Sequence, residues 1–397
     1  MKSYLELLQT ESILRRLSTI QLLAYFGAWF SNVAIYTLLL NLDVSKSIIA
    51  FVAMLHFLSG VLQAPFSGAI IDKFHPKKLM LFLIGIEFFS TLFLVFIQSV
   101  EELTFLYILV FLKMAAASFY FTTEMSLLPK ILTHKNLQKA NELHSMIWSF
   151  SYTVGMAVSG FFVYSFGVKA AFIFDAFMFF VAFWLLFGLD MKLVLQKQQA
   201  HFLKMMQESV VYLKQNKKVL HLMLLHGIVG FTAFDALVAL MVDEFYVGVI
   251  ATSLALGFLH AFRALGLVIG PMFLAKFMDN KRVVAIFIAQ AIAIYVWALV
   301  MQNFYLSLAA SVLVGFFTTS LWSYTYTLIQ TNTDAAYHGR VVAYNDMIFL
   351  GTSALSSYGI GFLATHSFSL ESITFVLGTM FLFGSIYFFW IVKKFKI

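Results

Sequence analysis

Long runs of apolar residues dominate the pattern along the chain, and short polar stretches separate them. A helix that crosses the hydrocarbon core of a bilayer needs about 20 consecutive apolar residues, because each residue adds about 1.5 Å. The first such run begins near Ser18, after an amphipathic segment that lacks the features of a cleavable signal peptide. By this criterion we predict twelve transmembrane helices. They cover residues 18–42, 47–71, 78–99, 103–128, 138–165, 168–189, 219–243, 249–275, 282–301, 304–330, 339–366 and 369–392.

One long polar stretch, residues 190–218, divides the predicted helices into six and six. We therefore predict an N-terminal six-helix bundle over 1–189, a cytoplasmic linker over 190–218 and a C-terminal six-helix bundle over 219–397. Weak internal repetition supports this division, since the Lys-Phe pairs at Lys73 and Lys276 follow equivalent spans in the two halves. Related halves are typical of secondary transporters.

The basic residues indicate the orientation of the chain. If the N-terminus is cytoplasmic, nearly all of the 26 Lys and Arg residues fall in cytoplasmic segments. Lys46 and Lys169 fall on the other side, and Lys113 and Arg263 lie within spans. This asymmetry follows the positive-inside rule. We therefore predict a multi-pass protein of the bacterial inner (cytoplasmic) membrane with both termini in the cytoplasm. The loops explain the net charge of +7 without a nucleic-acid partner.

The composition agrees with a lipid-facing surface and argues against an enzyme. Hydrophobic residues make up 61% of the chain and charged residues 11%, whereas soluble domains carry about 25% charged residues. Cysteine is absent, which excludes disulfides, thiolate metal sites and cysteine nucleophiles. We find no P-loop, no dinucleotide fingerprint and no HExxH sequence. We therefore expect no enzymatic activity, no bound metal and no cofactor, and ATP-driven transport has no support in the sequence.

The junction between the second and third predicted spans carries a motif of glycine, an Asp-Lys pair and further lysines. Its residues are Gly68, Asp72, Lys73, Lys77 and Lys78. This spacing resembles the best-known motif of the major facilitator superfamily, although the family glycine between the two basic groups is missing. The resemblance implies the major facilitator fold, an all-α membrane protein of two pseudo-symmetric six-helix bundles. It also implies that Asp72 latches the outward-facing state.

A second stretch narrows the resemblance. Residues 127–188 resemble the enterobactin-exporter and macrolide-efflux branch of that family, through the runs LLPK, ANEL and FIFDAFMFF. This likeness implies a secondary active transporter that exports a small amphiphilic, drug- or siderophore-like compound by alternating access, in exchange for protons. Its expected partners are a small-molecule substrate and membrane lipids, and we expect a monomer.

Charges inside spans are costly, so each is a functional candidate. Glu124 and Lys113 share one face of the fourth span, and the resemblance directs that face to the central cavity. Glu124 is a candidate proton- or cation-binding group and Lys113 a candidate substrate contact. Asp235 and Arg263 reach similar depths in the seventh and eighth spans and could form an exchangeable pair. For all four residues the alternative is a structural ion pair, or for Glu124 a place at the cytoplasmic mouth.

Two further groups are candidates. Trp322, Tyr324 and Tyr326 of the tenth span and Asn32 of the first combine apolar bulk with polar tips, which suits an amphiphilic substrate. Ordinary helix packing is the alternative. A set of polar residues near the cytoplasmic face is a candidate inner gate between the halves: Asn141, Glu142, Arg340 and Asp346.

Two other functions remain open. The histidines scattered over several spans could converge as a nickel or cobalt site, which would make the chain a divalent-metal exporter of the same fold. A lipid flippase is the other alternative. The sequence does not identify the substrate.

Overall fold

The structure, a computed structural model, describes residues 2–190, 202–274, 277–334 and 337–397. These residues form helices joined by short turns, and no strand occurs among them. They fall into two compact units. The first comprises Met1–Leu42 and Phe66–Gln199, and the second Asp43–Pro65 and Ala200–Ile397. The division thus passes through one helix, next to its internal Pro65. The boundaries of the two predicted bundles stay a prediction.

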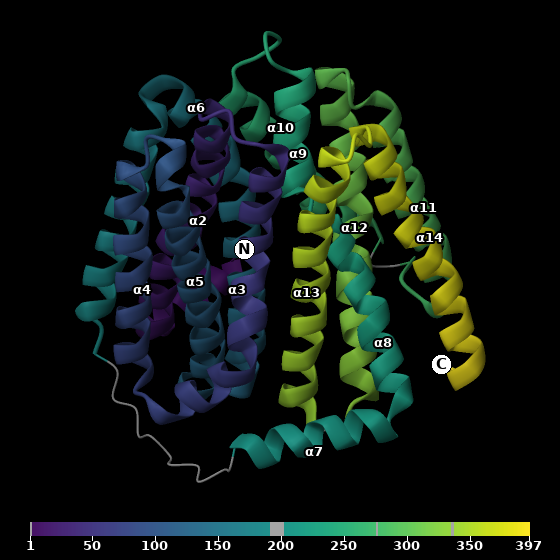
Figure 1. The fold of residues 1–397 in the computed structure, drawn as a ribbon. Coiled ribbons are helices and arrows are strands. Elements are labelled where there is room, and N and C mark those ends of the chain that lie inside the picture. Colours follow the sequence, from purple (N-terminus) through teal and green to yellow (C-terminus); the bar gives the residue numbers. More distant parts are fainter. Residues whose placement is uncertain (1, 191–201, 275–276, 335–336) are drawn as a thin grey trace. The chain divides into compact units, whose positions relative to one another are not determined.

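The first unit is built around two long, adjacent helices. Its elements are α1 (Lys2–Thr10), α2 (Ser12–Asn41), the end of α3 (Lys46–Lys73), α4 (Pro76–Phe93), η1 (Leu94–Phe96), η2 (Val100–Glu102), α5 (Leu103–Ile131) and α6 (His134–Phe187). Helix α2 packs along α6, and α4 packs against both α5 and α6 (Figure 1). Their contact faces form a core that includes Leu17, Met80 and Phe179, all fully buried.

Helix α6 contains two membrane spans, because the chain reverses within it. Gly167 has φ 83° and ψ 168°, a conformation that only glycine adopts without strain. Phe162 and Phe174 lie on either side of it, and their ring centroids are 5.1 Å apart. A continuous helix would separate the two residues by about 18 Å. The reversal therefore lies between the predicted spans 138–165 and 168–189.

The second unit contains the remaining helices and the first part of α3. Its elements are α7 (Phe202–Gln215), α8 (Lys217–Ile228), η3 (Val229–Thr232), α9 (Asp235–Phe245), α10 (Thr252–Leu274), α11 (Asn280–Val300), α12 (Phe304–Asn332), α13 (His338–Thr365) and α14 (Leu370–Phe395). Helix α10 packs on α12, and α11 packs on α14. The short helix α7 lies across the ends of α8 and α13 (Figure 1), within the stretch predicted as a linker.

The seventh predicted span is interrupted. The sequence predicts one span over 219–243, whereas the structure ends α8 at Ile228, inserts the 3₁₀ turn η3 and restarts the helix at Asp235. The apolar run continues through the break, so hydropathy gives no sign of it. A discontinuous membrane helix leaves backbone carbonyl groups that need other partners.

Eleven helices of the described residues are long and apolar enough to span a membrane. One of them, Lys139–Phe187, contains the reversal at Gly167 and therefore counts as two. The prediction of an all-α membrane protein with twelve spans is confirmed. The observed helix ends differ from the predicted ones by a few residues in either direction, because hydropathy does not register the caps and turns at which a helix begins and ends.

Glycines allow α10 and α12 to cross with their backbones touching. A methyl group on Gly266 would collide with the carbonyl of Val312, and one on Gly270 with the carbonyl of Phe316. In the opposite direction, Gly315 lies directly against the carbonyl of Arg263. The GxxxG spacing of Gly266 and Gly270 therefore marks a close helix crossing.

We expect Gly270→Ala to destabilise the protein, since overpacking a tight contact costs about 1–3 kcal/mol. The matched control is Gly85→Ala on α4, where no described atom lies within 4 Å of the new methyl group. Thermal unfolding of the purified protein in detergent measures both variants. A melting temperature for Gly270→Ala equal to that of the control would contradict the close crossing.

Candidate functional site

Glu124 is a buried carboxyl group, and one of its oxygens has no hydrogen-bonding partner among the described residues. It lies on α5, its side chain is 2% exposed, and its Oε2 makes no hydrogen bond to any described residue. The hydroxyl of Tyr120, one helical turn earlier, is also buried without a partner among the described residues. An unpaired charge inside a membrane protein is costly. Uptake of a proton would remove that charge, so Glu124 is well placed to bind one.

A polar cluster from neighbouring helices lies close to Glu124. The Nε2 of Gln21 on α2 lies 2.6 Å from the Nδ1 of His144 on α6. The His144 ring also contacts Tyr25 at 5.7 Å and Phe121 at 5.1 Å between centroids. Tyr25 is near enough to Glu124 for an electrostatic interaction. This Glu124 cluster thus combines a carboxyl group with an imidazole, an amide and a phenol in a buried setting.

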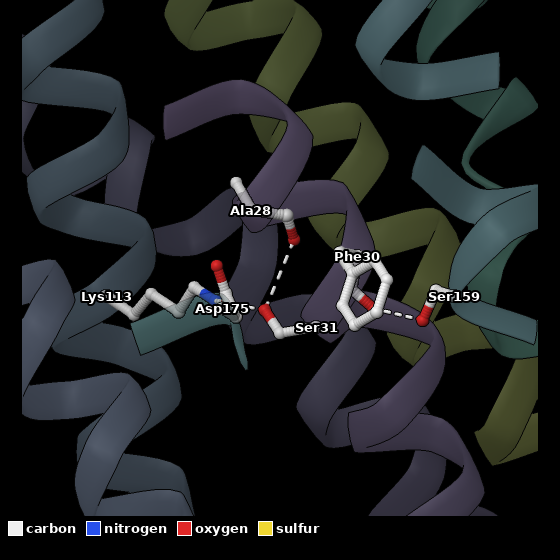
Figure 2. A network of polar contacts seen from close by, with 6 residues as sticks. All are labelled: Ala28, Phe30, Ser31, Lys113, Ser159 and Asp175. Atoms are coloured by element: carbon white, nitrogen blue, oxygen red, sulfur yellow. Dashed lines mark hydrogen bonds and ion pairs between the residues drawn. The ribbon is translucent and has the colours of Figure 1, made fainter. Parts of the chain in front are cut away.

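Lys113 forms a buried ion pair across the first unit. Its Nζ lies 2.8 Å from Oδ2 of Asp175, and the two side chains are 1% and 0% exposed. It also donates a short hydrogen bond to Ser31 Oγ of α2. Ser31 in turn donates to the carbonyl of Ala28 at 3.3 Å. Figure 2 shows how Lys113, Asp175 and Ser31 converge from α5, α6 and α2.

For Lys113 the sequence left open a substrate contact or a structural ion pair, and the structure shows the ion pair. Gly27 of α2 lies directly against Asp175 Oδ1, so a larger residue at position 27 would displace the carboxylate. Asn32, the neighbour of Ser31, is 4% exposed on the same helix. Glu87 of α4 is 2% exposed and interacts electrostatically with the pair. A possible contact between Lys113 or Asn32 and a substrate stays a prediction.

In the second unit, Arg263 stabilises the break in the seventh span. Its Nη2 donates to the carbonyl oxygen of Thr232 at 2.8 Å, and its guanidinium lies 5.1 Å from the ring centroid of Phe234. Arg263 therefore binds a carbonyl that a continuous helix would pair internally. Asp235, half-buried, is the first residue of α9, where a negative charge is favourable at a helix N-terminus. The structure thus brings both predicted residues to one place.

His260 adds an unsatisfied group beside this break. It is 1% exposed, and neither ring nitrogen has a hydrogen-bonding partner among the described residues. Both Asp235 and Arg263 are close enough to interact with it electrostatically. A carboxyl group, a guanidinium group and an imidazole therefore lie together at the break.

A second unsatisfied imidazole, that of His226 on α8, lies among aromatic side chains. Its Nδ1 lies 2.8 Å from Thr325 Oγ1, and Thr325 donates its only hydroxyl proton to the carbonyl of Leu321 at 2.7 Å. With its proton on this carbonyl, Thr325 accepts from His226, and in that tautomer the imidazole proton is on Nδ1. The lone pair on Nε2 is buried and has no partner among the described atoms.

The aromatic surroundings of His226 include two of the three aromatic residues predicted to contact a substrate. Its ring lies 5.5 Å from each of Trp322, Tyr326 and Phe349, measured between centroids. Trp322 and Tyr326 stack at 4.9 Å. Tyr324 lies elsewhere, because its hydroxyl donates to Asn280 Oδ1 of α11 at 2.7 Å. Residues 322 and 326 share a helix face and residue 324 does not.

The motif after the second span has only part of its side chains described. The side chain of Asp72 and the surroundings of Gly68 lie outside the described residues. Lys73 and Lys78 are exposed. Lys77 donates to the carbonyl of Phe187 at 2.7 Å, at the C-terminus of α6. A positive charge is favourable at that end of a helix.

Two of the predicted inner-gate residues bind other groups within their own units. Glu142 accepts a hydrogen bond from the Tyr4 hydroxyl at 2.6 Å. This bond raises the pKa of Tyr4, which therefore remains a donor at neutral pH. Arg340 lies 3.4 Å from Glu208 of α7 and stacks over Tyr337 at 4.8 Å.

The two remaining gate residues lie in the N-terminal parts of α6 and α13. Asn141 is exposed near the start of α6. Asp346 of α13 lies 3.5 Å from the Nδ2 of Asn345. Gate contacts between the halves stay a prediction.

The sequence pattern did not reveal Ser31 or the role of Thr325. Ser31 follows Gly27 by one helical turn, and a small residue at that spacing signals a close approach between helices. Thr325 lies one turn from Leu321, the spacing at which a threonine hydroxyl bonds back to its own helix. This local bond is what determines its role toward His226.

Comparison with known proteins places the chain in one family. The sequence profile described as the Major Facilitator Superfamily matches residues 17–282. A comparison with curated proteins found no match. Among solved structures, a D-xylose-proton symporter superposes with TM-score 0.76 at 11% identity, covering 95% of this chain and 97% of that one. The nucleoside transporter NupG gives 0.73 at 12% identity, covering 96% and 99%. A bacterial homologue of the iron transporter ferroportin gives 0.72 at 15%, covering 96% and 98%.

We expect Lys113→Met to be strongly destabilising, by about 3–5 kcal/mol, because it leaves Asp175 buried without its counter-charge. Replacing both residues, as Lys113→Met with Asp175→Leu, should restore most of the loss. The matched control is Lys46→Met, which breaks the half-exposed pair with Glu244 and should cost about 0–1 kcal/mol. Thermal unfolding in detergent compares the three. If Lys113→Met unfolds at the same temperature as Lys46→Met, the buried pair is not a stabilising contact.

Proposed function

The chain belongs to the Major Facilitator Superfamily and is a membrane transporter of that fold, and we propose that it exports a small amphiphilic organic compound in exchange for protons. The observation that carries this proposal is Glu124, a carboxyl group 2% exposed within a membrane span and without a hydrogen-bonding partner on Oε2 among the described residues. A charge held there is costly, so a proton that binds and leaves changes the energy of the site substantially.

The surroundings of His226 support an amphiphilic substrate. Trp322 is 36% exposed and stacks on Tyr326, so the aromatic surface extends from the buried imidazole to the accessible face of α12. Aromatic rings bind apolar parts of a ligand and attract cations. The free lone pair on His226 Nε2 can accept one hydrogen bond from a polar group. Together they suit a compound with an apolar body and a hydrogen-bond donor.

Proton binding can drive transport only if the two access states differ in their affinity for the proton. The interrupted seventh span offers a place where a conformational change can alter the surroundings of a charge. There, Asp235 begins α9, and Arg263 binds the Thr232 carbonyl across the break. A shift of α9 against α10 would change the distance between these two charges. We therefore assign Asp235 a part in the coupling beside Glu124.

The direction and the location follow from the sequence. Export rests on the likeness of residues 127–188 to the efflux branch of the family. The positive-inside pattern supports a bacterial inner membrane with both termini in the cytoplasm. Among the described residues, no three His, Asp or Glu side chains are grouped so as to hold a metal ion. Metal ions nevertheless belong in the substrate panel, because the histidines are numerous and several are buried.

Everted membrane vesicles that hold an acid-inside pH gradient test the proposal. A panel of dyes, macrolides, siderophores, nickel and cobalt is added, and a fluorescent pH probe reports proton release. We expect an organic compound to release protons, and we expect Glu124→Gln to reduce this release at least tenfold, because an amide cannot carry the proton. Asp235→Asn should weaken the coupling as well.

The matched control is Glu101→Gln, which neutralises an exposed carboxylate at the start of the fourth span and should leave proton release unchanged. Release of equal size from the Glu124→Gln and wild-type proteins would exclude Glu124 as the coupling group. A response to metals alone would replace the organic substrate by a divalent cation.

A further inference from the structure

Basic and aromatic side chains gather where α8 begins and α14 ends. We name this set the basic–aromatic cluster, and it consists of Lys217, His221, Tyr387, Trp390 and Lys394. The two helices pack against each other within the second unit. Neither the proposed coupling groups nor the aromatic surroundings of His226 include any of these residues.

Contacts among the rings hold the cluster in a defined arrangement. The Nδ1 of His221 lies 2.6 Å from the Tyr387 hydroxyl. Tyr387 and Trp390 stack at 5.8 Å with 11° between their planes, and His221 meets Trp390 edge-on at 4.9 Å. The rings therefore form a fixed platform between the ends of the two helices.

One cation of the cluster lies over these rings, and neither has an acidic counterpart in the described part of the chain. Lys394 Nζ lies 4.3 Å from the Trp390 ring centroid. Lys217 and Lys394 are both exposed, and both lie close enough to His221 to interact with it electrostatically. Among the described residues, neither lysine has a carboxylate within ion-pair distance, unlike Lys46, Arg282 and Arg340. Two positive charges that both act on one imidazole raise the local positive potential, so an anion beside them would be stabilising.

We propose that the basic–aromatic cluster binds the headgroup phosphate of an anionic glycerophospholipid. Lys217 and Lys394 would pair with the phosphate, and Trp390 would lie beside the upper acyl chains. This site goes beyond the proposed transport function and does not depend on it.

The position of the cluster favours a lipid over a free anion. Lys217 is the first residue of a membrane span and Lys394 lies within the last turn of another, so both reach the level of the headgroups. Trp390 is 39% exposed and Phe389, beside it, 62% exposed. Exposed aromatic residues at the end of a span are typical of the membrane interface. A lipid can satisfy the charge and cover these apolar surfaces together, whereas inorganic phosphate satisfies only the charge.

Tryptophan quenching by brominated lipids tests the site. The delipidated protein in detergent receives either phosphatidylglycerol or phosphatidylcholine with identical brominated acyl chains. The contribution of Trp390 is the tryptophan fluorescence of the wild-type protein minus that of Trp390→Phe. We expect phosphatidylglycerol to quench it at a lower concentration than phosphatidylcholine. In Lys217→Gln/Lys394→Gln this preference should fall by roughly 25-fold, since each lysine near a charged lipid surface contributes about fivefold.

The matched control is Lys139→Gln/Lys281→Gln, which removes the same charge from the ends of two other spans and should keep the preference. Quenching by phosphatidylcholine serves as the folding control for every variant. Equal quenching by the two lipids in the wild-type protein would overturn the proposal, and so would a preference retained by Lys217→Gln/Lys394→Gln. Loss of the preference in the presence of millimolar inorganic phosphate at constant ionic strength would identify a free-phosphate site in place of the lipid.

Discussion

Inside the hydrocarbon region of a membrane, a polar group must find its partner within the protein, because neither water nor lipid tails can supply one. Most of this structure obeys that constraint through helical backbone hydrogen bonds. Where a side chain carries the charge, the partner comes from a distant part of the sequence, as Asp175 does for Lys113. Where the backbone itself is interrupted, Arg263 supplies the missing donor to Thr232. The same requirement thus explains the ion pair of the first unit and the broken span of the second.

Several buried side-chain atoms are exceptions to this constraint, and four of them bear on the functional proposal. The Oε2 of Glu124, the Nε2 of His226 and both nitrogens of His260 are buried without partners in the described part of the chain. Such groups cost stability unless something binds to them for part of the time. For Glu124 the simplest occupant is a proton, and for His226 it is a hydrogen-bond donor from a substrate. Packing in the same helices is otherwise tight, with the backbones of α10 and α12 touching at their glycines.

Hydropathy alone predicted the helix content, the twelve spans and the reversal between the fifth and sixth, because apolar length is a local property of the sequence. It could not predict the break in the seventh span, where the apolar run is uninterrupted and the donor to the freed carbonyl, Arg263, lies on the next span. The partner of a buried charge is equally hard to predict from local sequence, since Lys113 and Asp175 lie on different helices. Helix periodicity could have separated Tyr324 from Trp322 and Tyr326, as residues two apart point in different directions. The roles of Glu124 and Asp235 in coupling remain predictions.

The reversal at Gly167 has a consequence for how the protein is made. Because a single glycine, at φ 83°, joins two helices whose rings already touch at Phe162 and Phe174, neither span has a connecting loop of its own. So short a connection favours entry of the two segments into the membrane together, as one helical hairpin. An epitope tag inserted at Gly167 would separate the two spans of this hairpin. A tag inserted between α6 and α7 would leave the hairpin intact.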